Sequence, residues 1–156
     1  MTPKDVSAWI EATFDGLIPV NAWGEKSYFY NPNSRFSRGA YFCTLKEKDG
    51  DNDKASNLDR DGIWRLNFGL PKSEFQNLFG PPPKRPTKGD AIRGAWEFRT
   101  TDLLMPHPVY GWMGWVAVLN PSTDTFDACK PLMKQAYDKS VAGFEARVHK
   151  QDRKQA

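Results

Sequence analysis

The sequence predicts a single α+β domain in two layers, with an antiparallel sheet of about five strands and helices on one face of that sheet. The first half holds short β-rich segments separated by turn residues, and such short connections join antiparallel neighbours. Amphipathic helical patterns stand near both ends of the chain. The expected domain covers residues 1–149, including a proline-rich insertion at 81–100, and a charged tail follows at 150–156.

Composition restricts the function classes. Of the 156 residues, 39% are hydrophobic and 26% are charged, which is typical of a soluble globular protein. The net charge of +3 is too small to indicate nucleic-acid binding by itself, because that binding depends on clustered Lys and Arg. No apolar run approaches the ~20 residues of a membrane span, and the first residues lack a signal peptide's apolar segment. We therefore expect a cytoplasmic protein that does not contact membranes.

The first expected element is a helix that begins after Thr2 and ends at Asp15-Gly16. Thr2 is a suitable N-cap, Pro3 suits the first turn, and Asp5 completes a capping box. Apolar residues then recur at helical spacing, at Val6, Trp9, Ile10 and Phe14. This pattern predicts a helix with one buried face.

Four β-rich segments follow the first helix. Leu17–Trp23 and Lys26–Tyr30 flank Gly24-Glu25, which is a hairpin signal. The third and fourth strands are expected at Ala40–Lys46 and Gly62–Leu70. Because the connections are short, we expect these strands to pair as antiparallel neighbours.

The fourth expected strand alternates strictly, and this alternation assigns its two faces. Trp64, Leu66 and Phe68 point to one face. Arg65 and Asn67 point to the other. If the helices cover the apolar face, these two polar side chains line the opposite, concave face of the sheet. An ordinary solvated sheet face is the alternative interpretation.

The second half of the chain mixes loops, a strand and a long helix. The expected elements are a short helix at Pro71–Phe79, a stiff linker at Pro81–Pro86, a helical turn at Thr101–Met105 and a central apolar strand at Trp112–Asn120. The C-terminal helix is expected to begin near Asp127, because Pro131 would then remove no ladder hydrogen bond. Its expected buried stripe consists of Cys129, Met133, Ala136, Tyr137, Ser140, Phe144 and Val148.

Several types of site are disfavoured by spacing. Cys43 and Cys129 lack the CxxC pattern, so buried thiols are expected rather than a disulfide or a metal pair. The acidic segment 49–53 has Lys54 and Arg60 where a calcium loop needs Gly and Glu, and it therefore predicts a solvated loop. The two histidines lie far apart, and nucleotide and nucleophile fingerprints are missing, so neither a metal nor a cofactor is expected.

The segment Met105–Gly111, followed by Trp112-Met113-Gly114-Trp115, is the strongest candidate site. His107 stands between two prolines, which fix the backbone and keep this residue out of a helix. Rigid loops that carry polar and aromatic side chains often form sites. The alternative is structural, with His107 bonded to a backbone carbonyl while Tyr110 and Trp112 fill the core. Because Trp112 and Trp115 are an odd number apart, an unbroken strand places Trp115 in the core and Trp112 beside the ligand.

Several local phrases resemble MmcQ/YjbR-like proteins, small bacterial domains of the secretion-chaperone-like fold. These phrases are Ala22-Trp23-Gly24-Glu25, Tyr41-Phe42-Cys43-Thr44-Leu45-Lys46, Arg65-Leu66-Asn67-Phe68-Gly69, Trp115-Val116-Ala117-Val118 and Ala136-Tyr137-Asp138-Lys139-Ser140-Val141. The resemblance implies a YjbR-like scaffold, and either the DNA-binding role proposed for such domains or sequestration of a drug. A closer resemblance, over nearly the whole chain, is to an uncharacterised bacterial family of similar length, whose members have sequences much like those of this chain at Leu104–Met113 and at Trp115–Ser122.

Three functions are therefore considered. The leading hypothesis is a non-enzymatic binding protein for a small planar or aromatic ligand, with His107, Tyr110, Trp112, Arg65 and Asn67 as the ligand-binding residues. The second is a nucleic-acid-binding module that uses Lys84, Arg85, Lys88 and Arg93 for phosphate contacts, a cluster that a solubilising loop also explains. The third is a cofactor-free enzyme with His107 as general base and Arg65 stabilising negative charge.

Overall fold

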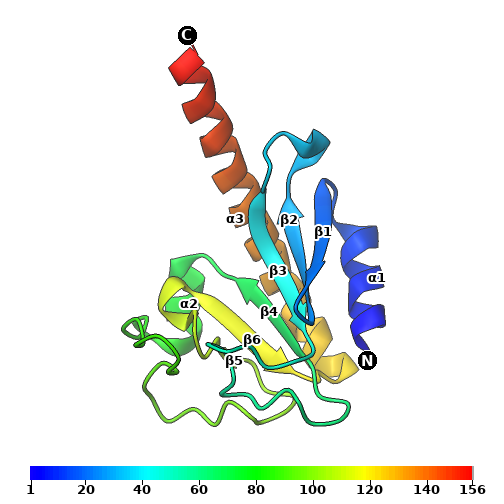
Figure 1. The fold of residues 1–156 in the computed structure, drawn as a ribbon, viewed down its shortest axis with the longest axis vertical. Helices are drawn as coiled ribbons and strands as arrows, with labels where there is room; N and C mark the ends of the chain where they lie inside the picture. Colours follow the sequence, from blue (N-terminus) through cyan, green and yellow to red (C-terminus); the bar gives the residue numbers. More distant parts are fainter. Residues whose placement is uncertain (156) are drawn as a thin grey trace.

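An open sheet of six antiparallel strands organises the computed structural model, which describes residues 1–155 (Figure 1). The strands are β1 (Leu17–Ala22), β2 (Glu25–Tyr30), β3 (Ala40–Lys46), β4 (Arg65–Gly69), β5 (Met105–Pro106) and β6 (Trp115–Leu119). Their order in the sheet is β1-β2-β3-β4-β6-β5. The helices are α1 (Pro3–Thr13), α2 (Lys72–Phe79) and α3 (Thr123–Gln155), with short 3-10 helices at Pro32–Ser34 and Gly111–Met113.

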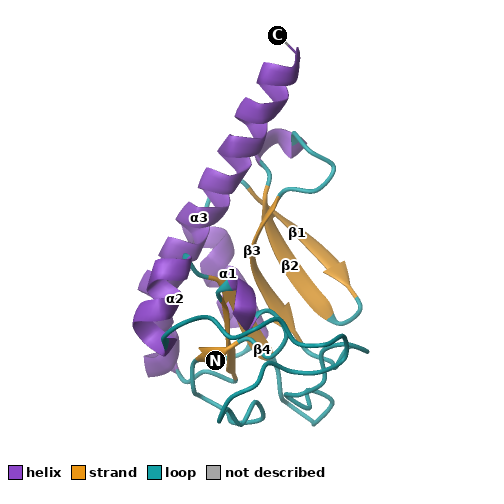
Figure 2. Ribbon diagram, turned by 90° about the vertical axis from the view of Figure 1, so that its left-hand side faces the viewer, coloured by secondary structure: helices purple, strands orange, loops and turns teal. Residues whose placement is uncertain are grey.

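The three helices pack on one face of the sheet and form the main core with it (Figure 2). Ile10 of α1, Phe75 of α2 and Met133 of α3 are fully buried against inward side chains of the strands, among them Leu66 and Phe68. The two-layer α+β class is therefore confirmed. The sheet has one strand more than expected, because the two-residue strand β5 pairs with the edge of β6.

The start of α1 follows from its capping box. The Asp5 backbone N–H donates to Thr2 Oγ1 (3.2 Å), and the Thr2 N–H donates to Asp5 Oδ2 (2.9 Å). These two bonds satisfy N–H groups that a helix start leaves without an internal partner. The predicted N-terminus of this helix is thus confirmed, and Val6 and Ile10 turn its apolar face toward the sheet.

The C-terminal helix starts earlier than the sequence predicts. α3 begins at Thr123, so the predicted start near Asp127 is wrong and Pro131 lies inside the helix. Ser122 caps the helix, since its Oγ accepts the Thr125 N–H (3.2 Å). Phe126, in the first turns, is only 1% exposed. Capping and the burial of this ring offset the ~3 kcal/mol that an interior proline costs.

Two predictions around the segment Met105–Gly111, called the His-Pro loop below, are also wrong. Thr101–Met105 does not form a helical turn, because Met105 and Pro106 pair with β6 as strand β5. Strand β6 does not begin at Trp112, because Gly114 adopts a left-handed conformation (φ 91°) that ends the 3-10 helix before the strand. The predicted central position of this strand is confirmed, since β6 lies between β4 and β5.

Two long loops, 47–64 and 80–104, cover part of the sheet face opposite the helices. A second, small core forms there from Leu58, Met105 and Leu119, with Ile63 and Trp96 packed against it. The proline-rich insertion contributes buried residues of its own, Ile92 and Phe98. The face that carries Arg65 and Asn67 is therefore covered, and the alternative of a solvated sheet face does not hold along β4.

Cys43 and Cys129 are free and buried, as their spacing predicts. Burial raises the pKa of the Cys129 thiol to about 11 and raises the pKa of the Cys43 thiol well above its ordinary value. Within residues 1–155, no three His, Cys, Asp or Glu side chains lie close enough together to hold a metal ion. In the same part of the chain, no helix has both the length and the apolar composition that crossing a membrane requires.

Candidate functional site

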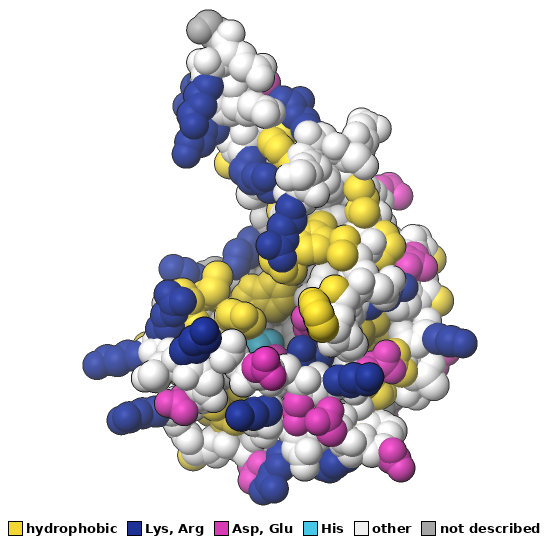
Figure 3. All heavy atoms as spheres, in the orientation of Figure 1, with side chains coloured by type: hydrophobic (Ala, Val, Ile, Leu, Met, Phe, Trp, Pro, Cys, Tyr) yellow, Lys and Arg dark blue, Asp and Glu magenta, His cyan; other side chains and the backbone are white. Residues whose placement is uncertain are grey.

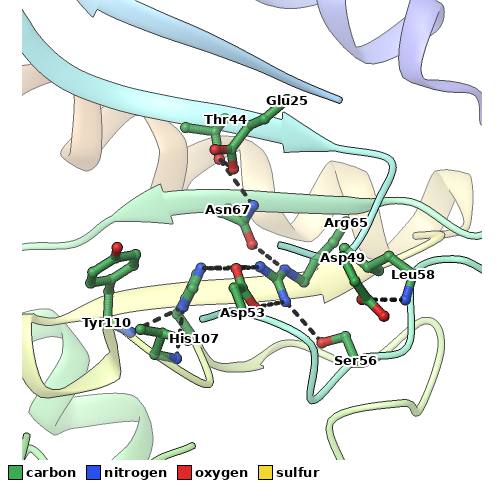
Figure 4. A network of polar contacts seen from close by, with 11 residues as sticks. Glu25, Thr44, Asp49, Asp53, Ser56, Leu58, Arg65, Asn67, His107 and Tyr110 are labelled. Carbon is green, nitrogen blue, oxygen red and sulfur yellow. Dashed lines mark hydrogen bonds and ion pairs between the residues drawn. The ribbon is translucent and has the colours of Figure 1, made fainter. Parts of the chain in front are cut away.

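Arg65 is the centre of a buried polar network beneath the loops (Figure 4). Its guanidinium is fully buried, and each of its nitrogens has a partner. Nε donates to Asn67 Oδ1 (2.7 Å), and Nη1 donates to Ser56 Oγ (2.9 Å) and to Asp53 Oδ1 (3.1 Å). Nη2 donates to the second oxygen of Asp53, which makes this ion pair bidentate.

Asp53 comes from the acidic segment 49–53, for which a solvated loop is expected. The structure contradicts this expectation for Asp53, whose side chain is 14% exposed and pairs with Arg65. Burial would raise the pKa of the Asp53 carboxyl, but the charge and hydrogen bonds of Arg65, together with the charge of Lys46, lower it below its ordinary value. Asp53 is therefore an anion that fixes the loop onto β4.

A second branch of the network crosses the sheet from β4 to β2. Asn67 and Thr44 are register partners on β4 and β3, and Asn67 Nδ2 donates to Thr44 Oγ1 (2.9 Å). Thr44 Oγ1 donates in turn to Glu25 Oε2 (3.1 Å). The branch ends at a carboxylate on the outer side of the network, so the polar groups of three strands are fixed together (Figure 4).

His107 locks the His-Pro loop through its side chain. The ring is only 3% exposed, and its Nδ1 accepts the backbone N–H groups of Val109 and Tyr110, both at 3.0 Å. Nε2 lies 3.2 Å from Arg65 Nη2 and 3.8 Å from Asp53 Oδ2. Because Nδ1 accepts two bonds, we assign the proton of the neutral imidazole to Nε2.

The protonation of His107 follows from the same surroundings. Burial and then the positive charge of Arg65 lower its pKa to about 3, although the charge of Asp53 acts in the opposite direction. The imidazole is therefore neutral near pH 7. Since its Nδ1 lone pair is engaged by two backbone donors, the ring offers the N–H at Nε2 rather than a free base.

A cavity of about 290 Å³ lies above this network, on the sheet face opposite the helices. The space-filling view shows this side of the molecule hollowed, with hydrophobic side chains gathered in the hollow and both basic and acidic ones around it (Figure 3). The lining consists of Glu25, Tyr41, Thr44, Lys46, Asp53, His107, Tyr110, Met113 and Trp115. Aromatic rings and a methionine thus meet ionised and hydrogen-bonding groups in one cavity.

Trp115 forms part of the cavity because of a glycine on the neighbouring strand. Trp115 and Gly69 are register partners, and a Cβ on Gly69 would lie 2.9 Å from the indole ring. The indole therefore lies over the backbone of β4, with the Tyr41 ring at 6.1 Å in an edge-to-face arrangement. The cavity wall depends on the missing side chain at position 69.

Neither tryptophan lies where the odd spacing of the two residues places it. Trp115 lines the cavity, whereas Trp112 lies on the 3-10 helix, outside the lining, with the Arg85 guanidinium 4.9 Å from its ring. The prediction from the odd spacing of the two tryptophans requires an unbroken strand from 112 to 115. The left-handed turn at Gly114 interrupts that strand, so the alternation does not extend back to Trp112.

The predicted ligand-binding residues are only partly brought together. His107 and Tyr110 line the cavity, while Arg65 and Asn67 are fully buried in the network that supports it. The sequence reasoning missed the lining residues Glu25, Tyr41, Thr44, Lys46, Asp53, Met113 and Trp115. Period-two alternation on β3 places Thr44 and Lys46 on one face, but only the strand register places them beside β4. The basic residues Lys84, Arg85, Lys88 and Arg93 are all exposed, on the 80–104 loop.

Comparison with known proteins gave one match, to a family model. Neither the curated proteins nor the solved structures contained a significant match to the chain. A model described as a family of unknown function, DUF6194, matches residues 1–149. This match confirms the expected uncharacterised family and adds nothing to the resemblance to MmcQ/YjbR-like domains. The chain thus belongs to the DUF6194 family of unknown function.

Proposed function

We propose that this protein binds a small planar or aromatic ligand in the cavity above the Arg65 network, without transforming the ligand chemically. One observation carries the proposal: the aromatic residues Tyr41, Tyr110 and Trp115 line one cavity together with polar and charged residues. Small-molecule sites typically combine apolar and aromatic walls with a few polar groups that fix orientation. Flat aromatic ligands gain most from such walls, because rings stack or meet edge to face.

The size and rigidity of the cavity support the same proposal. Its volume of about 290 Å³ is close to the lower end of the range for small-ligand sites, roughly 300–1,000 Å³. Its floor is fixed before any ligand arrives, because Arg65, Asn67 and Asp53 are held by one another and by Ser56 and Thr44. A preformed site avoids the free-energy cost of ordering side chains on binding.

The state of His107 favours a binding protein over an enzyme that uses this residue as a base. A general base works best with a pKa near the working pH, whereas burial lowers the pKa of His107 to about 3. Its Nδ1 lone pair is already engaged by two backbone N–H groups. The imidazole therefore suits the role of a hydrogen-bond donor to a bound ligand.

A nucleic-acid-binding module is the second candidate. It is favoured by the exposed basic loop and by the Arg85 guanidinium stacked on Trp112, since single strands bind to aromatic surfaces with cationic surroundings. The resemblance to MmcQ/YjbR-like domains points in the same direction. Tyr41 and Trp115 line a cavity of about 290 Å³ whose lining includes none of the four basic loop residues, and this ranks a small ligand above an extended strand.

A thermal-shift screen of planar compounds tests the proposal, with intrinsic fluorescence as a second readout. A ligand at a hundredfold excess over Kd stabilises the fold by ~2.7 kcal/mol, a readily measured shift in Tm. Tyr110→Ala should abolish the shift, because Tyr110 lines the cavity yet is 48% exposed and adds little to the core. Trp112→Ala is the matched control and should keep it. A compound whose binding depends on Trp112 but not on Tyr110 would contradict the proposed site.

A further inference from the structure

Charged side chains from three strands form a row on the sheet face that carries the cavity. Glu25 of β2 is the register partner of Lys46 on β3, and Lys46 is the register partner of Arg65 on β4. Arg65 is saturated with hydrogen bonds to Asp53, Ser56 and other partners. Lys46 differs, because its side chain is buried (7% exposed) and its ammonium has no hydrogen bond or ion pair with any residue in 1–155.

The ammonium of Lys46 is open to water and lies beside Gly50, with Nζ 3.5 Å from the position that a Cβ on Gly50 would take. Every side-chain nitrogen or oxygen that is shielded from solvent in residues 1–155 has a hydrogen-bond partner. The partnerless Nζ of Lys46 is therefore reached by water, and Lys46 is one of the residues that line the cavity. A nearly buried ammonium that relies on a few water molecules is poorly solvated. It offers up to three N–H donors to an occupant of the cavity.

His107 supplies a second donor with no acceptor at hydrogen-bond distance. Its proton lies on Nε2, where the nearest nitrogen is a guanidinium donor of Arg65 at 3.2 Å. The nearest carboxylate oxygen, Asp53 Oδ2, is 3.8 Å away, too far for a hydrogen bond. His107 and Lys46 thus line the same cavity; the Lys46 ammonium has no acceptor, and the oxygen nearest to His107 Nε2 is that of the Asp53 carboxylate at 3.8 Å.

The two carboxylates of the lining are already engaged. Asp53 receives hydrogen bonds from Arg65 on both oxygens, and Glu25 accepts the Thr44 hydroxyl proton. Two further cations stand beside the lining, with the Arg38 guanidinium 4.8 Å from the ring of Tyr41 and that of Arg85 over Trp112. The charges of Glu25 and Asp53 balance those of Lys46 and Arg65, so Arg38 and Arg85 leave the surroundings of the cavity positive, which favours an anion.

From this imbalance we infer that the ligand is an aromatic carboxylic acid, whose carboxylate is received by Lys46 Nζ and by the Nε2–H of His107. Its ring then lies among Tyr41, Tyr110 and Trp115, the rings of the lining. This inference rests on the proposed function and specifies the chemical class of the ligand. A carboxylate matches the site because it accepts several hydrogen bonds in one plane and neutralises the ammonium.

Three probes with one ring system test the inference by calorimetric titration: 2-naphthoate, 2-naphthamide and 2-naphthylmethylammonium. The acid should bind roughly tenfold or more tightly than the neutral amide, because charge-assisted hydrogen bonds are the stronger kind. The cationic probe should bind more weakly than the amide. Lys46→Met should reduce the preference for acid over amide to about twofold or less. Lys48→Met, an exposed lysine on the segment after β3, should leave the preference unchanged.

The outcomes separate the two proposals. Equal affinity of acid and amide for the unaltered protein overturns the inference and leaves the proposed function standing. If the cationic probe binds more tightly than the acid, the inference is also overturned and the proposed function stands. The Glu25 carboxylate would then be the group that binds the charged end of the ligand. Failure of all three probes to bind, together with a screen of planar compounds that yields none dependent on Tyr110, overturns the proposed function itself. Because the comparison of probes uses the unaltered chain, the test does not depend on whether Lys46→Met folds.

Discussion

At the scale of single residues, the Arg65–Asp53 pair is the most consequential interaction in the molecule. Arg65 is fully buried and Asp53 nearly so, and the Asp53 carboxylate joins the 47–64 loop to strand β4. Taking two charges out of water is unfavourable, so such a pair stabilises a fold only with good geometry and further hydrogen bonds. Ser56 and Asn67 supply those bonds here.

Removing one member of this pair should destabilise the protein strongly. Arg65→Met leaves the Asp53 carboxylate buried without its cation, and we expect a loss of ~3–5 kcal/mol in the free energy of unfolding. Adding Asp53→Asn to this variant should restore part of the loss, because the amide carries no charge. Urea denaturation measures both values. Arg99→Met breaks the exposed pair with Glu97 and should leave the urea midpoint nearly unchanged; equal losses in the two arginine variants would contradict this account.

His107 should make the stability of the protein depend on pH. Its pKa is lowered to about 3 in the folded state, against 6.5 for an unperturbed histidine, so below pH 6.5 the unfolded chain binds a proton that the folded chain does not. The free energy of unfolding is thus highest above pH 6.5 and falls as the pH falls toward 3, by roughly 2 kcal/mol at pH 5. Urea denaturation at several pH values measures this decline.

The contribution of His107 can be separated from those of other groups. The pKa of Asp53 is lowered from 3.8, so its own contribution is lost only below that value and does not affect the range from pH 6.5 to 4.5. His107→Asn should flatten the dependence in this range, whereas His149→Gln, at an exposed position of α3, should retain it. Identical pH profiles for His107→Asn and the unaltered chain would show that the ring titrates normally in the fold.

At the scale of elements, α3 holds the sheet from one side along most of its length and then extends beyond it (Figure 1). Its buried side chains reach from Phe126 to Phe144. Phe144, near the far end, is 6% exposed and meets the rings of Tyr30 and Phe36 edge to face, each at 5.2 Å. The helix therefore fixes the connection between β2 and β3 as well as the strands themselves.

Removing the Phe144 ring from this contact should destabilise the fold. Phe144→Ala removes a buried ring, and we expect a loss of ~3–5 kcal/mol in the free energy of unfolding. The urea midpoint measures the loss. Glu145→Ala, at the next and exposed position of the helix, is the control and should have little effect. An unchanged midpoint for Phe144→Ala would mean that the last turns of α3 do not pack as described.

The His-Pro loop acts as both a structural clasp and a cavity wall. Nδ1 of His107 secures the backbone of the loop, while the ring itself lines the cavity beside Tyr110. The sequence leaves open whether His107 faces a ligand or stabilises the loop, and the geometry of the ring is compatible with both. The ring accepts from backbone N–H groups, however, instead of bonding to a backbone carbonyl as expected.

At the scale of the whole molecule, the two faces of the sheet have different roles. Figure 2 shows the helices on one face of the sheet. That face is closed by an apolar core, whereas the other face carries a charged network, a cavity and two long loops. The four basic residues considered for phosphate contacts lie on the 80–104 loop, and the net charge of the chain is only +3. This distribution supports few simultaneous phosphate contacts.

We therefore expect at most weak binding of nucleic acids. Fluorescence anisotropy with duplex and single-stranded oligonucleotides at two salt concentrations should give dissociation constants above about 1 μM at physiological ionic strength. If all four loop cations contacted phosphates, the logarithm of the binding constant would fall with a slope of about −3.6 against the logarithm of salt concentration. Tighter binding with so steep a slope would reverse our ranking of the two candidate functions.

The sequence by itself determined the local features of this protein. The α1 capping box, the two faces of β4, the buried cysteines and the α+β class follow from residue spacing, because side-chain period and capping act over a few residues. The sequence also singled out His107 and Tyr110, both of which line the cavity. It placed the start of α3 wrongly, since burial of Phe126 outweighs the local preference of Pro131.

Only the tertiary structure decided the composition of the site. Strand register places Glu25, Lys46 and Arg65 in one row, and the path of the acidic loop brings Asp53 onto the guanidinium of Arg65. Register and loop path depend on the fit between segments far apart in the chain, and no local period encodes that fit. Gly69 makes room for the Trp115 ring, and these two residues are likewise far apart in the chain.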